Sequence, residues 1–364
     1  MQTIGVLTSG GDAPGMNAAI FAAVKVAAAR GIRVIGIERG YDGAIDGNFR
    51  PLTRPVLSSG SLAPVADIDL ITGIGGTILG STRCRRFYEP EYRTVAAGRM
   101  QGIGLDGLIV IGGNGSLTGA HALALESGSI PVVGIPASID NDIGCTSDSI
   151  GVDTAVNTII DACDRISDTA RSHQRAFIVE VMGRHSGYLA MVSSVATAAD
   201  AVLLPEVSKT DEELITGVEK IVRQSFTAER AKRRVLIIKA EGVAIPATRL
   251  AREVEERLSD HEEVEVRATV LGHVVRGGRP TYHDRMLAGR LALGAVSALV
   301  GGANDVMTAW NATTLGGTET GDPRVSTFRL EHVLEETNAL LDGTSDVSRR
   351  RVLRMQDVQG VLAL

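Results

Sequence analysis

The sequence predicts an α/β fold with a mostly parallel sheet. Short apolar runs alternate with longer amphipathic stretches, an order typical of βαβ units. Several of the short runs end at Gly or Pro, as strands do where a turn follows. The chain has 364 residues, enough for two domains or lobes at roughly 100–200 residues each. Since such sheets bind ligands at the carboxyl ends of their strands, functional residues are expected there.

Eight short runs, often rich in β-branched residues, are the predicted strands. They are Ile4–Thr8, Arg33–Ile37, Gly107–Ile111, Val132–Pro136, Ala176–Val181, Ala201–Pro205, Val235–Ala240 and Val266–Leu271. Two further regions, Tyr41–Gly80 and Asn311–Leu364, show no regular pattern that assigns them.

Three longer stretches are predicted helices. Asn17–Ala29 is rich in Ala and is followed by Gly31, a plausible C-terminal cap. Asp153–His173 has apolar residues three to four positions apart. Thr210–Ala231 opens with Thr-Asp-Glu-Glu, a pattern typical of a capped helix start.

Composition excludes several classes of function. The net charge of −6, from 37 basic and 43 acidic side chains, argues against a nucleic-acid partner. The N-terminus has no basic segment of a signal peptide, and no apolar run reaches the length of a membrane span. The three cysteines, Cys84, Cys145 and Cys163, are odd in number and lack metal-ligand spacing. We therefore expect a cytoplasmic protein without nucleic-acid or membrane partners.

Two Gly-rich turns follow predicted strands and precede helical sequence. The first runs from Thr8 to Asn17 and contains Gly10, Gly11 and Gly15, and the second is Gly112–Ser116. Glycines allow backbone amides to approach a phosphate, and a helix N-terminus favours its charge. The first turn lacks the Lys-Ser/Thr of a Walker loop. Each could be a structural turn alone, but the pair predicts a phosphate cradle.

A third motif, Pro136–Asp142, places Asp140 and Asp142 two residues apart just past a strand. In an extended loop the two carboxylates would point the same way. One could accept a proton from a hydroxyl and the other could meet a metal or its waters. Asp-Asn-Asp is also ordinary turn chemistry, and that alternative stays open.

Cationic side chains are scattered beside the predicted strand ends. Arginine forks suit phosphate oxygens, although any one of these side chains could be a solvated surface charge. His273 and Arg276 would share a face if that stretch forms a helical turn. The set comprises Arg83, Arg175, Arg184, Arg267, His273 and Arg276. Amide-rich turns, cations and a carboxylate together indicate phosphoryl transfer.

Seven ordered segments resemble the motifs of the 6-phosphofructokinases, from the N-terminus to about Arg285. They are LTSGGDAPGMNAA, GGTILGSTR, IGGNGS, SIDNDI, SHQR, VEVMGRHSG and RATVLGHVVRGG. The remaining C-terminal part resembles the family more weakly. The resemblance implies transfer of the ATP γ-phosphoryl group to the 1-hydroxyl of fructose 6-phosphate with Mg²⁺ as cofactor.

On the donor side, the resemblance implies that glycine turns and an Arg-Cys pair bind ATP. These residues are Gly11, Arg83, Cys84, Gly113, Asn114, Gly115 and Ser116. Asn114 stands where the family usually has a Mg²⁺-associated Asp, so metal affinity is expected to be weaker or rebuilt, and Asp142 is the other metal candidate. Cys84 replaces a common aromatic residue, which is expected to loosen nucleotide stacking.

On the acceptor side, the resemblance implies that Asp140 is the base, with Ser138, Gly11 and Arg184 assisting catalysis. Arg175 and Arg267 would reach the sugar phosphate from a neighbouring subunit, so a homodimer or homotetramer is expected. The implied substrate-binding residues are Ser138, Ile139, Asp140, Arg175, Met182, Gly183, Arg184, Glu241, Arg267, His273, Val274, Val275 and Arg276.

Two positions favour ATP over pyrophosphate as donor. Pyrophosphate-using members tend to carry Asp where Gly115 stands and Lys where Ala137 stands. The alternatives are the same reaction with pyrophosphate, a kinase of a related sugar phosphate such as sedoheptulose 7-phosphate, or a non-catalytic sugar-phosphate-binding subunit. Phe21, Lys25 and Ser167 occupy positions where bacterial relatives use effector-site arginines, so their usual allosteric control is expected to be weak or absent.

The expected architecture is two similar three-layer, Rossmann-like lobes with the active site in the cleft between them. The nucleotide-binding lobe would comprise residues 1–138 and about 255–305. The sugar-phosphate-binding lobe would comprise residues 139–254 and about 306–345, and residues 346–364 would form a C-terminal extension.

Overall fold

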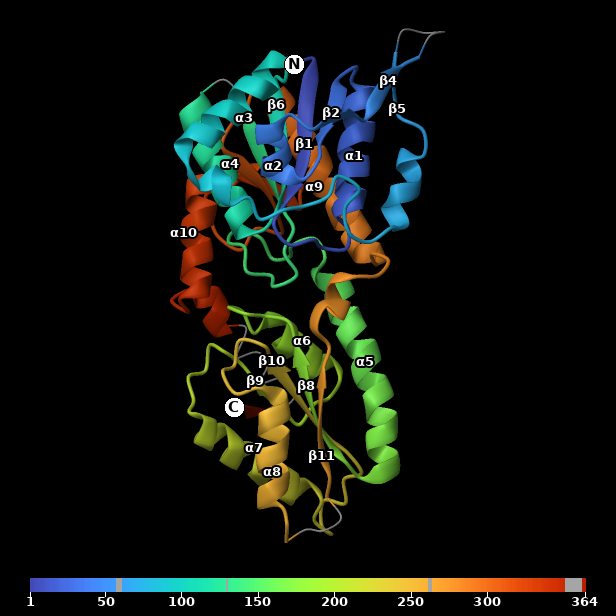
Figure 1. The fold of residues 1–364 in the computed structure, drawn as a ribbon, viewed down its shortest axis with the longest axis vertical. Coiled ribbons are helices and arrows are strands. Elements are labelled where there is room, and N and C mark those ends of the chain that lie inside the picture. The colour runs from blue at the N-terminus through green and yellow to red at the C-terminus, as the bar shows by residue number, and fades with distance from the viewer. Residues whose placement is uncertain (57–60, 129, 261–263, 351–361) are drawn as a thin grey trace. The chain divides into compact units, whose positions relative to one another are not determined.

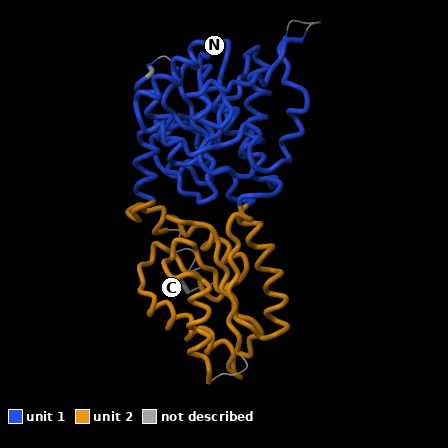
Figure 2. Tube along the Cα trace, viewed as in Figure 1, with its two compact units in different colours: residues 1–154, 276–340 blue, residues 155–275, 341–364 orange. Residues whose placement is uncertain are grey.

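The computed structural model describes residues 1–56, 61–128, 130–260, 264–350 and 362–364. The chain divides into two compact units (Figure 2). Unit 1 comprises Met1–Thr154 and Arg276–Leu340, and unit 2 comprises Ala155–Val275 and Leu341–Leu364. The α/β class predicted from the sequence is confirmed in both.

Unit 1 contains an eight-stranded sheet of order β13-β14-β12-β7-β6-β1-β2-β3. The five strands from β12 to β2 are parallel, and the antiparallel neighbours stand at the edges. The strands are β1 (Thr3–Ser9), β2 (Arg33–Ile37), β3 (Phe49–Pro51), β6 (Gly107–Gly112), β7 (Val132–Pro136), β12 (Val306–Trp310), β13 (Thr318–Glu319) and β14 (Val325–Arg329). A small separate sheet pairs β4 (Thr53–Pro55) with β5 (Leu62–Pro64).

Helices cover both faces of this sheet, giving three layers (Figure 1). On one face α1 (Met16–Ala29) packs against α9 (Tyr282–Val300). The other face holds α2 (Gly40–Asp46), α3 (Pro90–Gly102) and α4 (Asn114–Ser127), whose buried side chains form one core with Leu7, Leu108 and Val132. The remaining elements are the 3-10 helices η1 (Ile68–Gly73) and η2 (Arg85–Tyr88) and helix α10 (Leu330–Leu341).

Unit 2 contains a wholly parallel sheet of order β11-β8-β10-β9-β15. Its strands are β8 (Ala176–Val181), β9 (Ala201–Leu203), β10 (Val235–Ala240), β11 (Val266–Val270) and β15 (Leu362–Ala363). Its helical elements are α5 (Val152–His173), α6 (Tyr188–Ala196), α7 (Asp211–Ser225), α8 (Ala247–Arg257) and η3 (Gly272–Arg276). The apolar faces of α7 and α8 pack with one face of the sheet into a single core.

The predicted strands and helices are confirmed, with small changes at their ends. Gly31 has a φ of 72° just after α1, the left-handed conformation expected of a C-terminal glycine. Thr210 caps α7 through a reciprocal capping box with Glu213. That helix ends at Ser225 rather than at Ala231, because Lys232 N returns to Ser225 O at 3.2 Å and closes the chain into a turn.

The predicted lobe boundaries need correction. β12 pairs in parallel with β7, through Val306↔Val133, so residues 306–340 belong to unit 1 and not to the other lobe. β11 pairs with β8, so residues 255–275 belong to unit 2. Residues 139–154 stay in unit 1, and the predicted C-terminal extension contributes β15 to unit 2. Strand pairings between distant segments set these boundaries, and local patterns do not report them.

The Tyr41–Gly80 region, which has no regular sequence pattern, holds only short elements: α2, β3, β4, β5 and η1. Among the helices that the structure describes, none combines the length and the apolar character needed to cross a membrane.

Candidate active site

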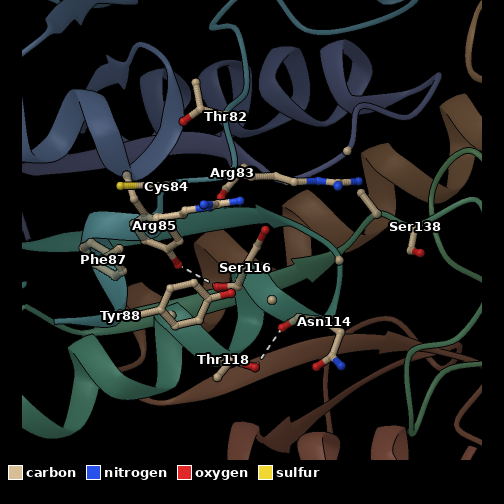
Figure 3. Close-up of a pocket in the computed structure, with 18 of the residues that line it drawn as sticks. Thr82, Arg83, Cys84, Arg85, Phe87, Tyr88, Asn114, Ser116, Thr118 and Ser138 are labelled. Atoms are coloured by element: carbon tan, nitrogen blue, oxygen red, sulfur yellow. Dashed lines mark hydrogen bonds between the residues drawn. The ribbon is translucent and has the colours of Figure 1, made fainter. Parts of the chain in front are cut away.

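A cavity of about 450 Å³ lies in unit 1 at the carboxyl ends of its parallel strands (Figure 3). It brings together both Gly-rich turns and the loop after β7, as the sequence predicts. The predicted site residues that line it are Gly11, Arg83, Cys84, Gly113, Asn114, Gly115, Ser116, Ser138, Asp140 and Arg276.

The turn after β1 needs glycine for two different reasons. Gly10 has a φ of 83°, a left-handed conformation that other residues adopt at a cost. A Cβ at Gly11 would lie 2.9 Å from Arg276 Nη1, so glycine leaves room for that guanidinium. Arg276 donates to Asp12 O at 3.0 Å, which fixes a cation against this turn.

The turn after β6 leads directly into α4. A Cβ at Gly112 would lie 2.5 Å from Ser116 Oγ and 2.6 Å from Ser9 O, so only glycine lets the two turns approach this closely. Asn114 and Gly115 are the first two residues of α4, so their backbone amides have no acceptor within the helix, whereas Ser116 N already donates to Gly113 O at 3.0 Å. The helix dipole adds to these amides, so this end of the cavity attracts anions.

The loop after β7 forms a tight turn, not the extended segment expected from the sequence. Asn141 has a φ of 46° and donates its N–H to Ser138 O at 3.3 Å. Its side chain holds the turn by accepting from Ser149 N at 3.0 Å and donating to Ser147 O at 2.9 Å. The two carboxylates therefore separate: Asp140 lines the cavity, whereas Asp142 accepts from Ser138 Oγ at 2.7 Å.

Aromatic residues that sequence reasoning missed form one wall of the cavity. Tyr41 and Phe87 stack with ring centroids 3.9 Å apart and planes 14° apart. Tyr41 donates to Ser116 O at 2.6 Å, and burial raises its pKa. Tyr88 also lines the cavity and is 74% exposed. Aromatic side chains thus line the cavity at Phe87 and Tyr88, three and four residues after Cys84.

Cys84 lies at the cavity edge in a network around Asp42. Its Sγ donates to Asp42 Oδ1 at 3.1 Å, and Thr82 Oγ1 donates to Asp42 Oδ2 at 2.8 Å. Arg86 binds the same carboxylate and also Asp46. Burial and the bond to Asp42 raise the pKa of Cys84 to about 11, so the thiol stays protonated at neutral pH.

In unit 2, two predicted substrate-binding segments come together at the ends of neighbouring strands. Met182, Gly183 and Arg184 follow β8, and Glu241 follows β10. Glu241 N donates to Val181 O at 2.9 Å, and Gly242 N donates to Gly183 O at 3.1 Å. The side chains of Arg184 and Glu241 are exposed beside this junction.

The two arginines expected to serve a neighbouring subunit share one carboxylate of their own chain. Arg175 Nε lies 2.5 Å from Glu265 Oε2, and Arg267 Nη2 lies 2.8 Å from the same oxygen. Arg267 Nη1 also binds Glu255 Oε1 at 3.0 Å. The hydrogen bond from Arg175 holds the pKa of Glu265 below its usual value.

The other predicted acceptor-side residues lie in or near η3 and the loop after β7. His273 and Arg276 both lie in η3, which confirms the helical turn on which their shared face depends. His273 and Val274 are exposed. The side chains of Ile139 and Val275 are fully buried, which leaves their backbone atoms as the groups available to a ligand.

Comparisons of the chain with a family model and with curated proteins all indicate the same family. The family model described as Phosphofructokinase matches residues 3–299. A Thermotoga neapolitana protein named ATP-dependent 6-phosphofructokinase is 48% identical over 309 residues, covering 85% of this chain and 90% of that protein. The ATP-dependent 6-phosphofructokinase 1 of Thermus thermophilus is 46% identical over 307 residues, covering 84% and 89%.

Solved structures of phosphofructokinases have folds similar to that of this chain. Phosphofructokinase from Pichia pastoris matches with a TM-score of 0.84 at 29% identity; the match covers 98% of this chain but only 39% of that longer one. A pyrophosphate-dependent phosphofructokinase from Marinobacter aquaeolei matches with a TM-score of 0.74 at 18% identity, covering 92% and 84%, a likeness of fold alone.

Proposed function

This chain belongs to the phosphofructokinase family, and from that premise we propose that it transfers the γ-phosphoryl group of ATP to the 1-hydroxyl of fructose 6-phosphate. The products are fructose 1,6-bisphosphate and ADP, and the reaction is a step of glycolysis. One observation supports this most directly: a single cavity contains two amide-rich turns and the carboxylate of Asp140.

The phosphate end of the cavity supplies positioning and charge. Phosphoryl transfer asks mainly for these, because the transferred group carries its charge on oxygens and needs little covalent help. The first-turn amides of α4 and the glycines after β1 would bind donor phosphate oxygens. Arg83 and Arg276 line the same cavity and would neutralise charge that develops during transfer.

Asp140 is the proposed general base. It would accept the proton of the sugar 1-hydroxyl as the oxygen attacks the γ-phosphorus. Ser138 lines the cavity beside it, and the bond from Ser138 Oγ to Asp142 holds the two ends of the turn together. Asp142 is therefore placed to support the turn that presents Asp140.

ATP is the donor that the cavity favours. Gly115 adds no negative charge at the start of α4, and Ala137 offers no lysine to neutralise pyrophosphate. The aromatic wall of Tyr41, Phe87 and Tyr88 provides an apolar surface that only a base-bearing donor would use. Several relatives at 42–49% identity carry ATP dependence in their names.

Mg²⁺ is the proposed cofactor. No cluster of three or more His, Cys, Asp or Glu side chains arranged to hold a metal occurs in the described ranges. In enzymes that act on phosphates, Mg²⁺ is usually bound through substrate phosphates and water with one or two protein ligands. Asn114 and Asp142 are the candidate ligands, and the ion would neutralise charge on the phosphates.

Unit 2 residues are the proposed holders of the sugar phosphate. Arg184 offers an exposed guanidinium and His273 an exposed imidazole, and Glu241 offers a carboxylate to a sugar hydroxyl. Arg175 and Arg267 would act on the site of a neighbouring subunit, so we propose a homodimer or homotetramer. We also propose a cytoplasmic location, where both substrates are found.

The test is an assay of purified protein with fructose 6-phosphate, Mg²⁺, and either ATP or pyrophosphate. Asp140→Asn should lower kcat roughly 10²–10⁴-fold, as loss of a general base does, with little change in substrate KM. Asp148→Asn is the control, because this half-buried aspartate lies on the same loop but does not line the cavity. Absence of transfer from either donor, or an Asp140→Asn variant as active as the control, would contradict the proposal.

A further inference from the structure

Arg93 lines the donor cavity, yet its guanidinium is turned to the protein. Nε and Nη2 donate to the two oxygens of Glu126 at 2.7 and 2.6 Å. Nη1 donates to both Phe87 O and Tyr88 O, at 2.7 Å each. These bonds use four of the five N–H groups that an arginine has. Arg93 is therefore committed to protein partners and is a poor candidate for a phosphate ligand.

We propose that Arg93 and Glu126 form a positioning clamp that holds Phe87 and Tyr88, the aromatic wall of the donor cavity, where they can receive the base of the nucleotide. The inference rests on the proposed function, because it assumes that the donor carries a base. It assigns to Arg93 and Glu126 a part in binding that base rather than a part in the chemical step.

The wall needs external support because its own backbone forms only a short 3-10 turn. Phe87 and Tyr88 belong to η2, a single 3-10 turn of four residues. Such turns have few internal hydrogen bonds and poor bond geometry. Arg93 comes from α3 and Glu126 from the last turn of α4, so the clamp ties η2 to two longer helices.

The clamped wall connects physically to the phosphate end of the cavity. The Phe87 ring stacks on Tyr41, and Tyr41 donates to Ser116 O in the first turn of α4. Gly119 makes room for this stack, since a Cβ there would lie 2.9 Å from the Tyr41 ring. Displacement of η2 would therefore change the distance between the base-binding wall and the phosphate-binding turn.

Phe87 and Tyr88 have different roles in the wall. Phe87 is 5% exposed and fixes the wall against the core, whereas Tyr88 is 74% exposed and leaves its ring free at the cavity surface. An exposed aromatic ring held by its backbone is suited to stacking on a base, and stacking is sensitive to the position of the ring. The chemistry that this surface would recognise is the planar base of a nucleotide.

The experiment compares wild type, Arg93→Gln and Glu126→Gln in steady-state assays with ATP and GTP and in calorimetric titrations with ADP. Arg290→Gln is the matched control: Arg290 makes a two-pronged bond to Asp322 in the same unit but does not line the cavity. Each clamp variant should raise the KM for ATP and the Kd for ADP roughly tenfold, the size expected from losing charged hydrogen bonds. The KM for GTP should rise by a similar factor, because stacking tolerates any base, while kcat and the KM for fructose 6-phosphate stay within about twofold.

Other outcomes overturn the clamp. A lower kcat with unchanged KM for ATP would mean that Arg93 acts on the chemical step. A loss of melting temperature equal to that of Arg290→Gln, with unchanged nucleotide affinity, would mean a purely structural pair. Should Arg93→Gln fail to fold, Glu126→Gln decides, since its side chain is 39% exposed and its loss is better tolerated. If wild type binds ADP but transfers nothing from ATP, the proposed function fails while the titration still tests the clamp.

Discussion

A negative charge placed at position 115 should weaken binding of the donor without impairing the folding of the protein. Gly115 is the second residue of α4, lines the donor cavity, and lies outside the left-handed region of backbone conformation. A Cβ built there meets no atom within 4 Å. Gly115→Asp should therefore fold without strain and put a carboxylate beside the donor phosphates.

The two effects of this substitution have opposite signs. Replacing Gly in a helix, and adding an acid to its first turn, should stabilise the protein by up to about 1 kcal/mol. Two unit charges roughly 5 Å apart at an effective dielectric constant of about 20 repel by about 3 kcal/mol. ATP binding should therefore weaken by roughly 100-fold while the melting temperature stays the same or rises.

The assay measures kcat/KM for ATP and the melting temperature of Gly115→Asp and Gly115→Asn. Asn has nearly the volume of Asp but no charge, so it should lose little activity. Equal losses in the two variants would show that volume, not charge, matters at this position. An Asp variant with the ATP affinity of wild type would refute the placement of the phosphates beside α4.

Three further results are expected. Asn114→Asp should lower the Mg²⁺ concentration needed for half-maximal activity, measured by metal titration; loss of all activity would mean that the metal is held elsewhere. The bond from Arg93 holds the pKa of Glu126 below 4.5, so the stability that this pair contributes is present above that pH and is lost as the pH falls through the lowered pKa. Melting curves should accordingly show the gap between wild type and Glu126→Gln closing in acid, and a constant gap would refute this linkage. ADP should not activate the enzyme strongly at low fructose 6-phosphate, because Phe21 and Lys25 stand where the family resemblance places effector-site arginines. Strong activation in an ADP titration would contradict that expectation.

Strands, helices and turns that depend on neighbouring residues in the chain could be predicted from the sequence. Strand β6 is a run of apolar residues, and α7 begins at a capping box, so each follows from the residues it contains. The glycine turns after β1 and β6 and the carboxylate of Asp140 were likewise found from their place after a strand. Ligand sites of parallel sheets lie at the carboxyl ends of strands, so the residues that follow the predicted strands identified the lining of the cavity.

Long-range contacts decided the rest. β12 joins the sheet of unit 1 by pairing with β7, more than a hundred residues earlier, and that pairing moves the predicted lobe boundary. The wall of Tyr41 and Phe87 and its clamp by Arg93 unite segments from separate helices and turns. No local sequence motif marks Tyr41, Phe87 or Arg93 as parts of one site. The sequence by itself therefore determined the elements, the glycine turns proposed to bind phosphate and the proposed base. The tertiary structure alone decided what surrounds them, because packing and strand pairing join residues whose separation along the chain carries no local signal.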